Sequence, residues 1–316
     1  MSSYRDRLPQ LGGGLFLADG GLETTLIFHE GITLPYFAAF SLLSTVDGTQ
    51  VLRRYFERYA KIARAQEVGL VLETPTWRAN PDWAAKLGYD ARALAEVQKR
   101  SVELLLEIRA GFETGPTRIV ISGNLGPRGD GYNPSNRMSA AEAEAYHAPQ
   151  VRDFTRTEAD MVAAFTMNYT EEAIGITLAA KAAGMPVAIS FTTETDGRLP
   201  AGESLDQAMA RTDDASDGYP VYYMINCAHP THLEGALARE GEWRDRIRGL
   251  RANASRRSHA ELDESTDLDA GNPEELAWQY RKLRRQFRRL SVVGGCCGTD
   301  HRHVEAIGRA LTAVHP

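Results

Sequence analysis

The chain has 316 residues, of which 43% are hydrophobic and 25% are charged, so it is long enough to bury a full core. Its 36 basic and 42 acidic side chains give a net charge of −6, a balance that offers no general reason to bind nucleic acid. The sequence lacks both a run apolar enough to span a membrane and an N-terminal signal peptide, so we expect a cytoplasmic protein without membrane partners.

Apolar runs alternate with helical periodicities along the chain. Residues 1–10 are predicted to be a loose N-terminal lead-in. The predicted strands are 14–19, 69–73, 118–122, 160–165, 187–191, 219–227, 248–253 and the run that ends at Val293. The predicted helices are 49–67, 91–110, 139–158, 171–183, 204–213, 233–238, 273–289 and 303–314. Residues 254–272 are predicted to form a polar loop.

Eight strand-then-helix units indicate a parallel sheet. Eight units in about 300 residues predict a single (β/α)₈ barrel, one domain over residues 1–316. A doubly wound sheet is the alternative, but the first strand is not followed by a Gly-x-Gly-x-x-Gly motif to support dinucleotide binding.

All three cysteines of the chain lie at the ends of predicted strands. Cys227 ends the sixth strand, and Cys296 and Cys297 follow the eighth in a glycine-rich turn. Such residues can be small buried hydrophobes, and a Cys227–Cys296 disulfide would leave Cys297 over. An intracellular chain keeps its thiols reduced, which favours a metal. Three thiolates can hold zinc and leave its fourth position open, as in catalytic zinc sites.

The barrel sharpens this interpretation, because barrel enzymes carry their chemistry at the C-terminal ends of the strands. Asp19 ends the first strand, which closes against the eighth. We therefore expect Asp19 to lie beside the cysteine pair.

Three segments together resemble the homocysteine S-methyltransferase family. They are Asp19-Gly20-Gly21, Asn226-Cys227 and the run Gly294-Gly295-Cys296-Cys297-Gly298-Thr299, each after a predicted strand. The resemblance covers nearly the whole chain. It implies a zinc ion held by Cys227, Cys296 and Cys297, and transfer of a methyl group from a small-molecule donor to the thiolate of homocysteine, giving methionine.

The resemblance also assigns substrate contacts. The aspartate matching Asp19, followed by Gly20, helps to bind the substrate's ammonium group, and Asn124 lies in the loop after the third strand that shapes the pocket. No catalytic residue is implied beyond the zinc-bound substrate thiolate. A turn or cap residue is the alternative interpretation of Asp19.

Two positions depart from the family pattern. Phe165 stands where the family usually has a glutamate that also holds the ammonium. Glu73, at the end of the second strand, is our hypothesis for the replacement carboxylate, although it could instead pair with Arg78. Trp77 falls where the family can have a tyrosine near the substrate, or it is a lid or core aromatic.

Several readings stay open. The donor can be S-methylmethionine, S-adenosylmethionine or betaine, with S-methylmethionine placed ahead of betaine. The same zinc site could act on a different thiol or selenol, or the protein could bind a thiol amino acid without turnover. The oligomeric state is not encoded in any pattern we recognise.

Overall fold

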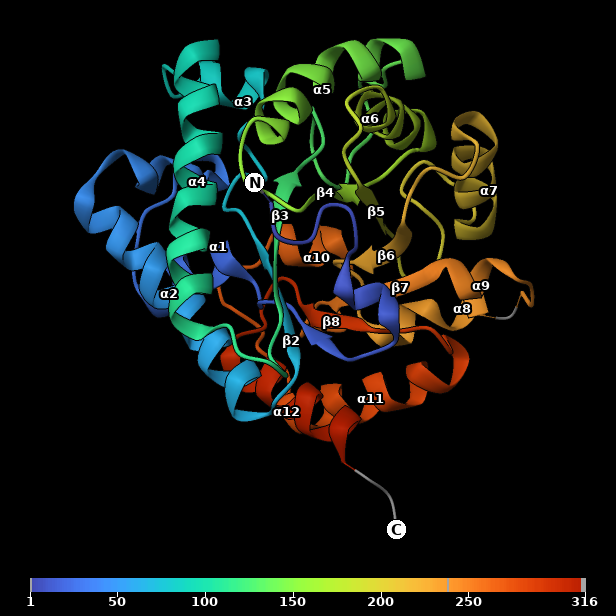
Figure 1. The fold of residues 1–316 in the computed structure, drawn as a ribbon. Coiled ribbons are helices and arrows are strands. Elements are labelled where there is room, and N and C mark those ends of the chain that lie inside the picture. The colour runs from blue at the N-terminus through green and yellow to red at the C-terminus, as the bar shows by residue number, and fades with distance from the viewer. Residues whose placement is uncertain (1, 238, 314–316) are drawn as a thin grey trace.

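The computed structural model describes residues 2–237 and 239–313 and shows a closed barrel of parallel strands ringed by helices (Figure 1). Each strand pairs with the next in chain order, and the first closes against the last. The strands are β1 (Phe16–Leu17), β2 (Gly69–Glu73), β3 (Ile119–Leu125), β4 (Met161–Met167), β5 (Val187–Thr192), β6 (Tyr222–Asn226), β7 (Ile247–Ala252) and β8 (Val292–Gly295). The predicted (β/α)₈ barrel is therefore confirmed.

Seven longer helices of the described residues surround the barrel, with α5 and α6 along its upper edge and α11 and α12 along its lower edge in Figure 1. They are α2 (Val46–Ala65), α4 (Ala91–Phe112), α5 (Ala140–Thr155), α6 (Thr170–Ala182), α7 (Leu205–Ser216), α11 (Pro273–Gln286) and α12 (His301–Thr312). None of the helices in the described ranges has the length and apolar composition that crossing a membrane requires.

Short helices occupy the connections. They are η1 (Pro9–Gly12), α1 (Leu22–Thr24), η2 (Thr25–His29), η3 (Pro35–Phe37), η4 (Ala39–Ser44), α3 (Pro81–Ala85), η5 (Pro230–Leu233), α8 (Glu234–Leu237), α9 (Trp243–Arg246) and α10 (His259–Asp263). The last of them corrects the prediction that 254–272 is loop throughout. Ser258 and Glu261 form a capping box, which is enough to start a short helix in a polar segment that lacks apolar periodicity. The predicted helix ends at residues 238 and 314 lie outside the described ranges.

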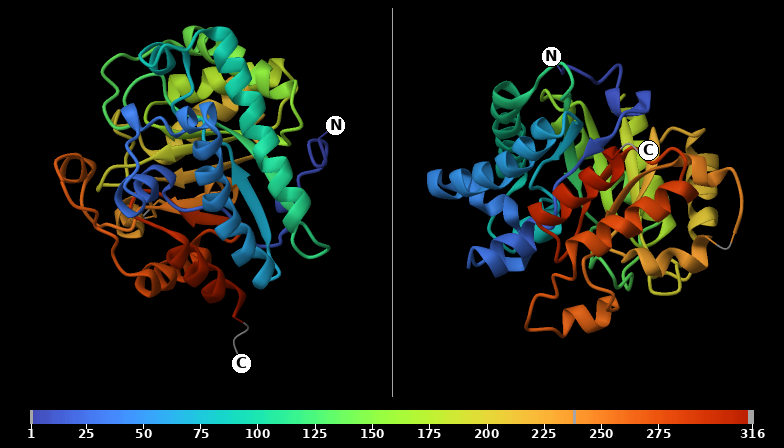
Figure 2. Two further views of the ribbon diagram at one scale, coloured as in Figure 1. Left: turned by 90° about the vertical axis from the view of Figure 1, so that its left-hand side faces the viewer. Right: turned by 90° about the horizontal axis from the view of Figure 1, so that it is seen from below.

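The N-terminal lead-in differs from the loose segment that we expected. The backbone N–H of Tyr4 donates to Asp160 Oδ1 at 2.8 Å, and the Arg5 guanidinium donates to the carbonyls of Thr155, Thr157 and Ala159. Leu8 is buried against the apolar residues inside the barrel. These contacts fix the segment across the N-terminal end of the barrel, at the opposite end from α10 in both views of Figure 2.

Side chains inside the barrel change character along its axis. Alternate strand residues build an inner apolar cluster, separate from the larger cluster that lies mainly between sheet and helices. Its strand members are Phe16, Val71, Val120, Met161, Ala163, Phe165, Ala188, Tyr222, Met224 and Val292. At the C-terminal end, buried polar side chains replace them: Glu73, Ser122, Asn226 and Arg251. Parallel pairing sets Glu73 opposite Ser122 and Asn226 opposite Arg251. The barrel thus has one polar end.

Candidate metal centre and acceptor pocket

The three cysteines meet at this polar end. Cys227 follows β6 directly, and Cys296 and Cys297 follow β8. Their Sγ atoms all lie within 4.8 Å of one another, and no other group of three potential metal-ligating side chains comes this close in the described part of the chain. Cys227 is buried, whereas Cys296 and Cys297 are half-buried. The convergence expected from the barrel topology is therefore present.

The sulfur atoms of Cys227 and Cys296 are joined as a disulfide, and Cys297 is not part of it. In the reduced form the same donor set suits zinc, because thiolates at Zn–S distances of about 2.3 Å lie about 3.8 Å apart in a tetrahedral site. A spread of at most 4.8 Å needs only a small adjustment of side chains to reach that geometry. Three protein ligands would leave the fourth position for a substrate thiol.

Asn226 ties Cys227 to the neighbouring strands. Its Oδ1 accepts hydrogen bonds from the Thr166 backbone N–H at 3.0 Å and from Ser190 Oγ at 2.7 Å. Its Nδ2 donates to Thr166 Oγ1 at 3.0 Å and to Cys227 Sγ at 3.1 Å. A donor aimed at a sulfur stabilises the thiolate form. The asparagine of the Asn-Cys pair is thus fully hydrogen-bonded and orients the sulfur of Cys227.

The backbone around Cys227 is held in an uncommon conformation. Cys227 has φ 56° and Thr166 has φ 63°, both in the left-handed region that non-glycine residues seldom occupy. The Cys227 carbonyl accepts from His259 Nε2 at 2.6 Å and from Asn253 Nδ2 at 2.9 Å. His259 also contacts Glu194 and stacks on Tyr132. Such strain persists where surrounding contacts determine it, as they do here.

Two glycines at the end of β8 allow the chain to pack closely there. A Cβ on Gly295 would lie 2.0 Å from Thr299 Oγ1, and one on Gly294 would lie 2.7 Å from the Asp19 carbonyl. The Gly295 backbone N–H donates to the Asp19 carbonyl at 2.8 Å. Asp19 therefore lies beside the cysteine pair, as expected.

The Asp19 carboxylate, however, already has a cationic partner. It forms a buried ion pair with the guanidinium of Arg251 on β7, and the Tyr55 hydroxyl donates to its other oxygen at 3.1 Å. Arg251 also donates to the carbonyls of Gly20 and Gly295, both at 3.1 Å. Burial raises the pKa of Asp19, while Arg251 and Tyr55 act in the opposite direction.

Phe165 is placed next to the same guanidinium. The Arg251 Cζ lies 5.0 Å from the centre of the phenyl ring, a cation–π distance. The ring therefore stacks against a cation that belongs to the protein. Sequence reasoning missed Arg251, because it lies inside a strand and its partner Asp19 is 232 residues away in the chain.

Glu73 is buried at the polar end with one oxygen, Oε2, that has no hydrogen-bond partner among the described residues. Burial raises the pKa of Glu73 to about 8, opposed by Arg251 and Ser122. No ion pair joins Glu73 to Arg78 in the described ranges. Arg78 lies instead 4.1 Å from the Trp77 ring centre and 4.0 Å from that of Trp83.

Other predicted contacts present unused polar atoms. Trp77 Nε1 and Asn124 Oδ1 are both buried without a partner in the part of the chain that the structure describes. Trp77 packs against the inner apolar cluster, and Gly126 approaches it so closely that a Cβ there would lie 2.2 Å from its carbonyl. Sequence reasoning did not single out Glu23 of α1, which lies close enough to Asp19 for the two to interact: burial and Asp19 raise the pKa of Glu23 to about 7.

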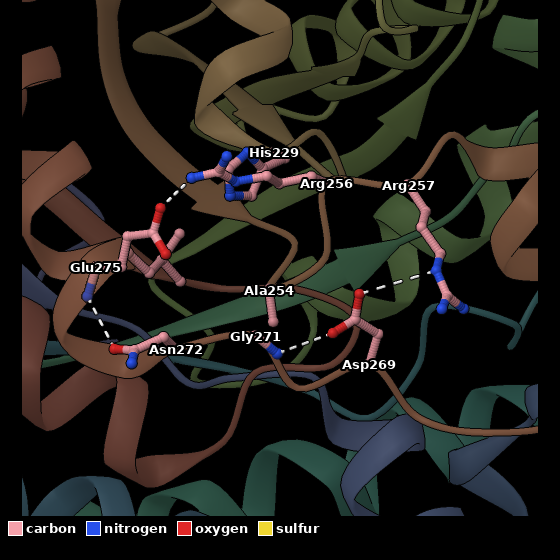
Figure 3. A pocket seen from close by; sticks show the side chains of 9 residues that line it. His229, Ala254, Arg256, Arg257, Asp269, Gly271, Asn272 and Glu275 are labelled. Carbon is pink, nitrogen blue, oxygen red and sulfur yellow. Dashed lines mark hydrogen bonds and ion pairs between the residues drawn. The ribbon is translucent and has the colours of Figure 1, made fainter.

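A separate hollow of about 200 Å³ lies between the loop after β7 and the start of α11 (Figure 3). Its charged side chains are paired with one another. Arg256 contacts Glu275, and Arg257 Nε lies 4.0 Å from Asp269. Burial lowers the pKa of His229 in its wall to about 4. Because these charged side chains are already paired, the hollow offers no unpaired charge to a ligand.

The fold and the cysteine cluster together define the class: a (β/α)₈ barrel with three cysteine sulfurs gathered at the C-terminal ends of its strands. The sequence model of the family described as Homocysteine S-methyltransferase matches residues 16–311. The chain belongs to this family.

Named relatives agree with this assignment. Homocysteine S-methyltransferase 1 of Arabidopsis thaliana is 22% identical over 95% of this chain and 94% of its own length, and homocysteine S-methyltransferase 4 of Zea mays is 22% identical over 95% and 90%. The homocysteine methyltransferase MmuM of Escherichia coli, in its metallated form, superposes with a TM-score of 0.71 at 20% identity, over 94% of this chain and 96% of MmuM. Its oxidized form gives 0.74 at 21% identity, over 95% and 97%. At this identity the structures support the fold.

Proposed function

We propose that this protein transfers a methyl group from a small-molecule donor to the thiolate of homocysteine, giving methionine. The observation that carries the proposal is the convergence of three cysteine sulfurs within 4.8 Å at the mouth of a family barrel. Cys227, Cys296 and Cys297 would hold zinc, and the chemistry supplied by a bound zinc is a lower pKa for the acceptor thiol.

The chain's own residues orient this site. Asn226 and His259 fix Cys227 from both sides, through its sulfur and its carbonyl. The glycines of the β8 turn bring the other two cysteines against Asp19. Nothing in the geometry selects among S-methylmethionine, S-adenosylmethionine and betaine as donor, so the donor is a matter for assay.

A second candidate acceptor is a different thiol or selenol. Phe165 and Arg251 favour it, since they give the pocket an apolar ring and a resident cation where the family pattern has a glutamate. A protein that binds a thiol amino acid without turnover would have the same pocket and no methylated product.

The test starts with zinc content, measured on protein purified without added metal under reducing conditions. We expect about one zinc per chain in the wild type and little in Cys297→Ser. Methyl transfer to homocysteine is then assayed with each donor by detection of methionine. Zinc without product from any donor would favour the binding protein, and absence of zinc would remove the basis of the proposal.

A further inference from the structure

At the polar end of the barrel, the side chains of Arg251, Asp19 and Glu73 have an unusual arrangement. Arg251 is almost fully buried, with a side chain 9% exposed. Its Nε and Nη2 are taken up by carbonyl groups and by Asp19. Nη1 makes no hydrogen bond with any of the described residues. It is also not fully shielded from solvent. One nitrogen of the guanidinium is therefore unpaired and partly accessible.

Asp19 is in a poor position to bind a second cation. Its two oxygens are occupied by Arg251 and by the Tyr55 hydroxyl. An ammonium group at Asp19 would have to share these oxygens with the guanidinium that is paired directly to them, whereas like charges in direct contact repel. The apolar ring of Phe165 on the face of the same guanidinium supplies no negative charge to offset this.

Glu73 has the complementary properties. Its buried Oε2 lacks a hydrogen-bond partner in the described ranges, and the carboxyl is close enough to Arg251 and Ser122 for both to affect its pKa. Deprotonation of a buried carboxyl becomes favourable when a cation arrives next to it. Glu73 is thus an unused acceptor near a cation with an unused donor.

From this arrangement we infer that Arg251 and Glu73 bind the head group of the thiol acceptor, that is, its carboxylate and ammonium groups. The unpaired Nη1 of Arg251 binds the carboxylate, and Glu73 binds the ammonium group. Asp19 is then a positioning residue that holds Arg251 and does not contact the ammonium. This inference rests on the proposed function for the sulfur end of the ligand. Arg251 donates to the carbonyl of Gly295, the residue before Cys296, so head group and sulfur fit one short ligand.

Three thiols separate the two ends of the head group. Homocysteine carries both charges, sulfanylbutanoate lacks the ammonium, and aminopropanethiol lacks the carboxylate. We would measure their dissociation constants by calorimetry on the zinc-loaded protein. A charge-assisted hydrogen bond in a buried site predicts that loss of the carboxylate weakens binding roughly 10- to 100-fold. Equal binding of homocysteine and aminopropanethiol would overturn the inference.

Variants of Arg251 and Asp19 show whether Arg251 causes the preference for ligands with a carboxylate. Arg251→Lys keeps the charge beside Asp19 but loses the planar fork, so it should weaken both carboxylate ligands roughly 10-fold and leave aminopropanethiol unchanged. The double variant Asp19→Asn, Arg251→Gln leaves no unpaired charge and should show the same pattern if the single variant does not fold. Arg248→Lys, at the opposite end of β7, is the matched control. Equal effects on all three ligands would contradict the assignment.

Asp19→Asn distinguishes positioning from direct contact. If Asp19 acts through Arg251, the variant weakens sulfanylbutanoate as much as homocysteine, with a higher KM and little change in kcat. If Asp19 binds the ammonium, sulfanylbutanoate is unaffected and our inference is wrong. Methionine, which has no thiol, serves to test Glu73: its binding near pH 7 should release a proton in wild type and none in Glu73→Gln, because the free carboxyl has a pKa of about 8. Release that persists in the variant would remove Glu73 from the site.

The outcomes separate this inference from the proposed function. Binding that follows the carboxylate without methylated product from any donor keeps Arg251 as the head-group residue and rejects the methyltransferase. Methyl transfer that is equally efficient to thiols with and without a carboxylate would support the proposed methyltransferase function and reject the role of Arg251. Failure of all three thiols to bind the zinc-loaded protein rejects both.

Discussion

The two ends of this barrel each bury a carboxyl group, and the two groups differ in how completely they are hydrogen-bonded. At the N-terminal end, Asp160 accepts hydrogen bonds from the backbone N–H groups of Tyr4 and Ile121 and from the Arg109 guanidinium. At the C-terminal end, Glu73 keeps one oxygen without a partner in the described ranges, and its pKa is raised. Completed pairing gives stability, whereas incomplete pairing leaves groups ready for a ligand.

Uncommon backbone conformations also occur beside the cysteines. Thr166 and Cys227, both with positive φ, lie at the C-terminal ends of their strands. The N-terminal end is covered by the lead-in and by the inner apolar cluster. We therefore expect substitutions at the two ends to separate activity from stability, and four predictions test this.

The largest effect is expected from removal of the metal. A strong chelator should reduce methyl transfer to background under reducing conditions, and added zinc should restore it, because the three cysteine sulfurs lie close enough together to bind a zinc ion as thiolates. The circular dichroism of the barrel should remain, since the core does not depend on the site. Cys297→Ser provides the control, which should show no chelator effect. Full activity in the chelator would contradict the assignment of the site.

Asn226→Ala should come next. It leaves Ser190 and the Thr166 backbone without their acceptor and removes the donor to Cys227 Sγ. We expect zinc affinity to fall about 10- to 100-fold, as for other groups that orient metal ligands, and stability to fall by about 2 kcal/mol. Competition with a zinc indicator measures the first and urea unfolding the second. Asn133→Ala, at an exposed position, should change neither.

Glu73→Gln should stabilise the protein, more so as the pH rises. The native carboxyl has a pKa of about 8 against an ordinary 4.5, so between these values the native state holds a proton that the unfolded state has lost. The free energy of unfolding of the wild type therefore falls as the pH rises through this window, by about 1.4 kcal/mol for each pH unit. Urea unfolding of the metal-free proteins at about pH 5 and about pH 8 measures the difference. Glu261→Gln is the control, because Ser258 holds the pKa of this exposed group below its usual value; a gain with pH in both variants would exclude burial as the cause.

The smallest effect on function is expected at the other end. Arg5→Ala removes the side-chain hydrogen bonds to the carbonyls of residues 155, 157 and 159. We expect a loss of about 1 to 2 kcal/mol in the free energy of unfolding and an unchanged kcat/KM. Arg7→Ala, in the same segment, is a suitable comparison. A fall in kcat/KM with unchanged stability would remove the distinction between the two ends.

The barrel was predictable because each strand is an apolar run and each longer helix has its own periodicity. The cysteine site followed from topology, since parallel strands bring residues 227 and 296 to one mouth. Local patterns do not encode distant partners, which explains the errors. The lead-in depends on Asp160, and the Arg251–Asp19 pair joins β7 to the end of β1. Arg251 in a strand looks like an interruption until its partner is known.

The anchored lead-in also bears on how the chain is made. Tyr4 is synthesised well before its partner, because the carboxylate that receives its backbone hydrogen bond is 156 residues further on. The first strand must wait longer still, because one of its two neighbours is the last strand to be synthesised. Both segments therefore stay without their final partners until these later parts of the chain have been made, and the barrel can close only after β8 has been synthesised.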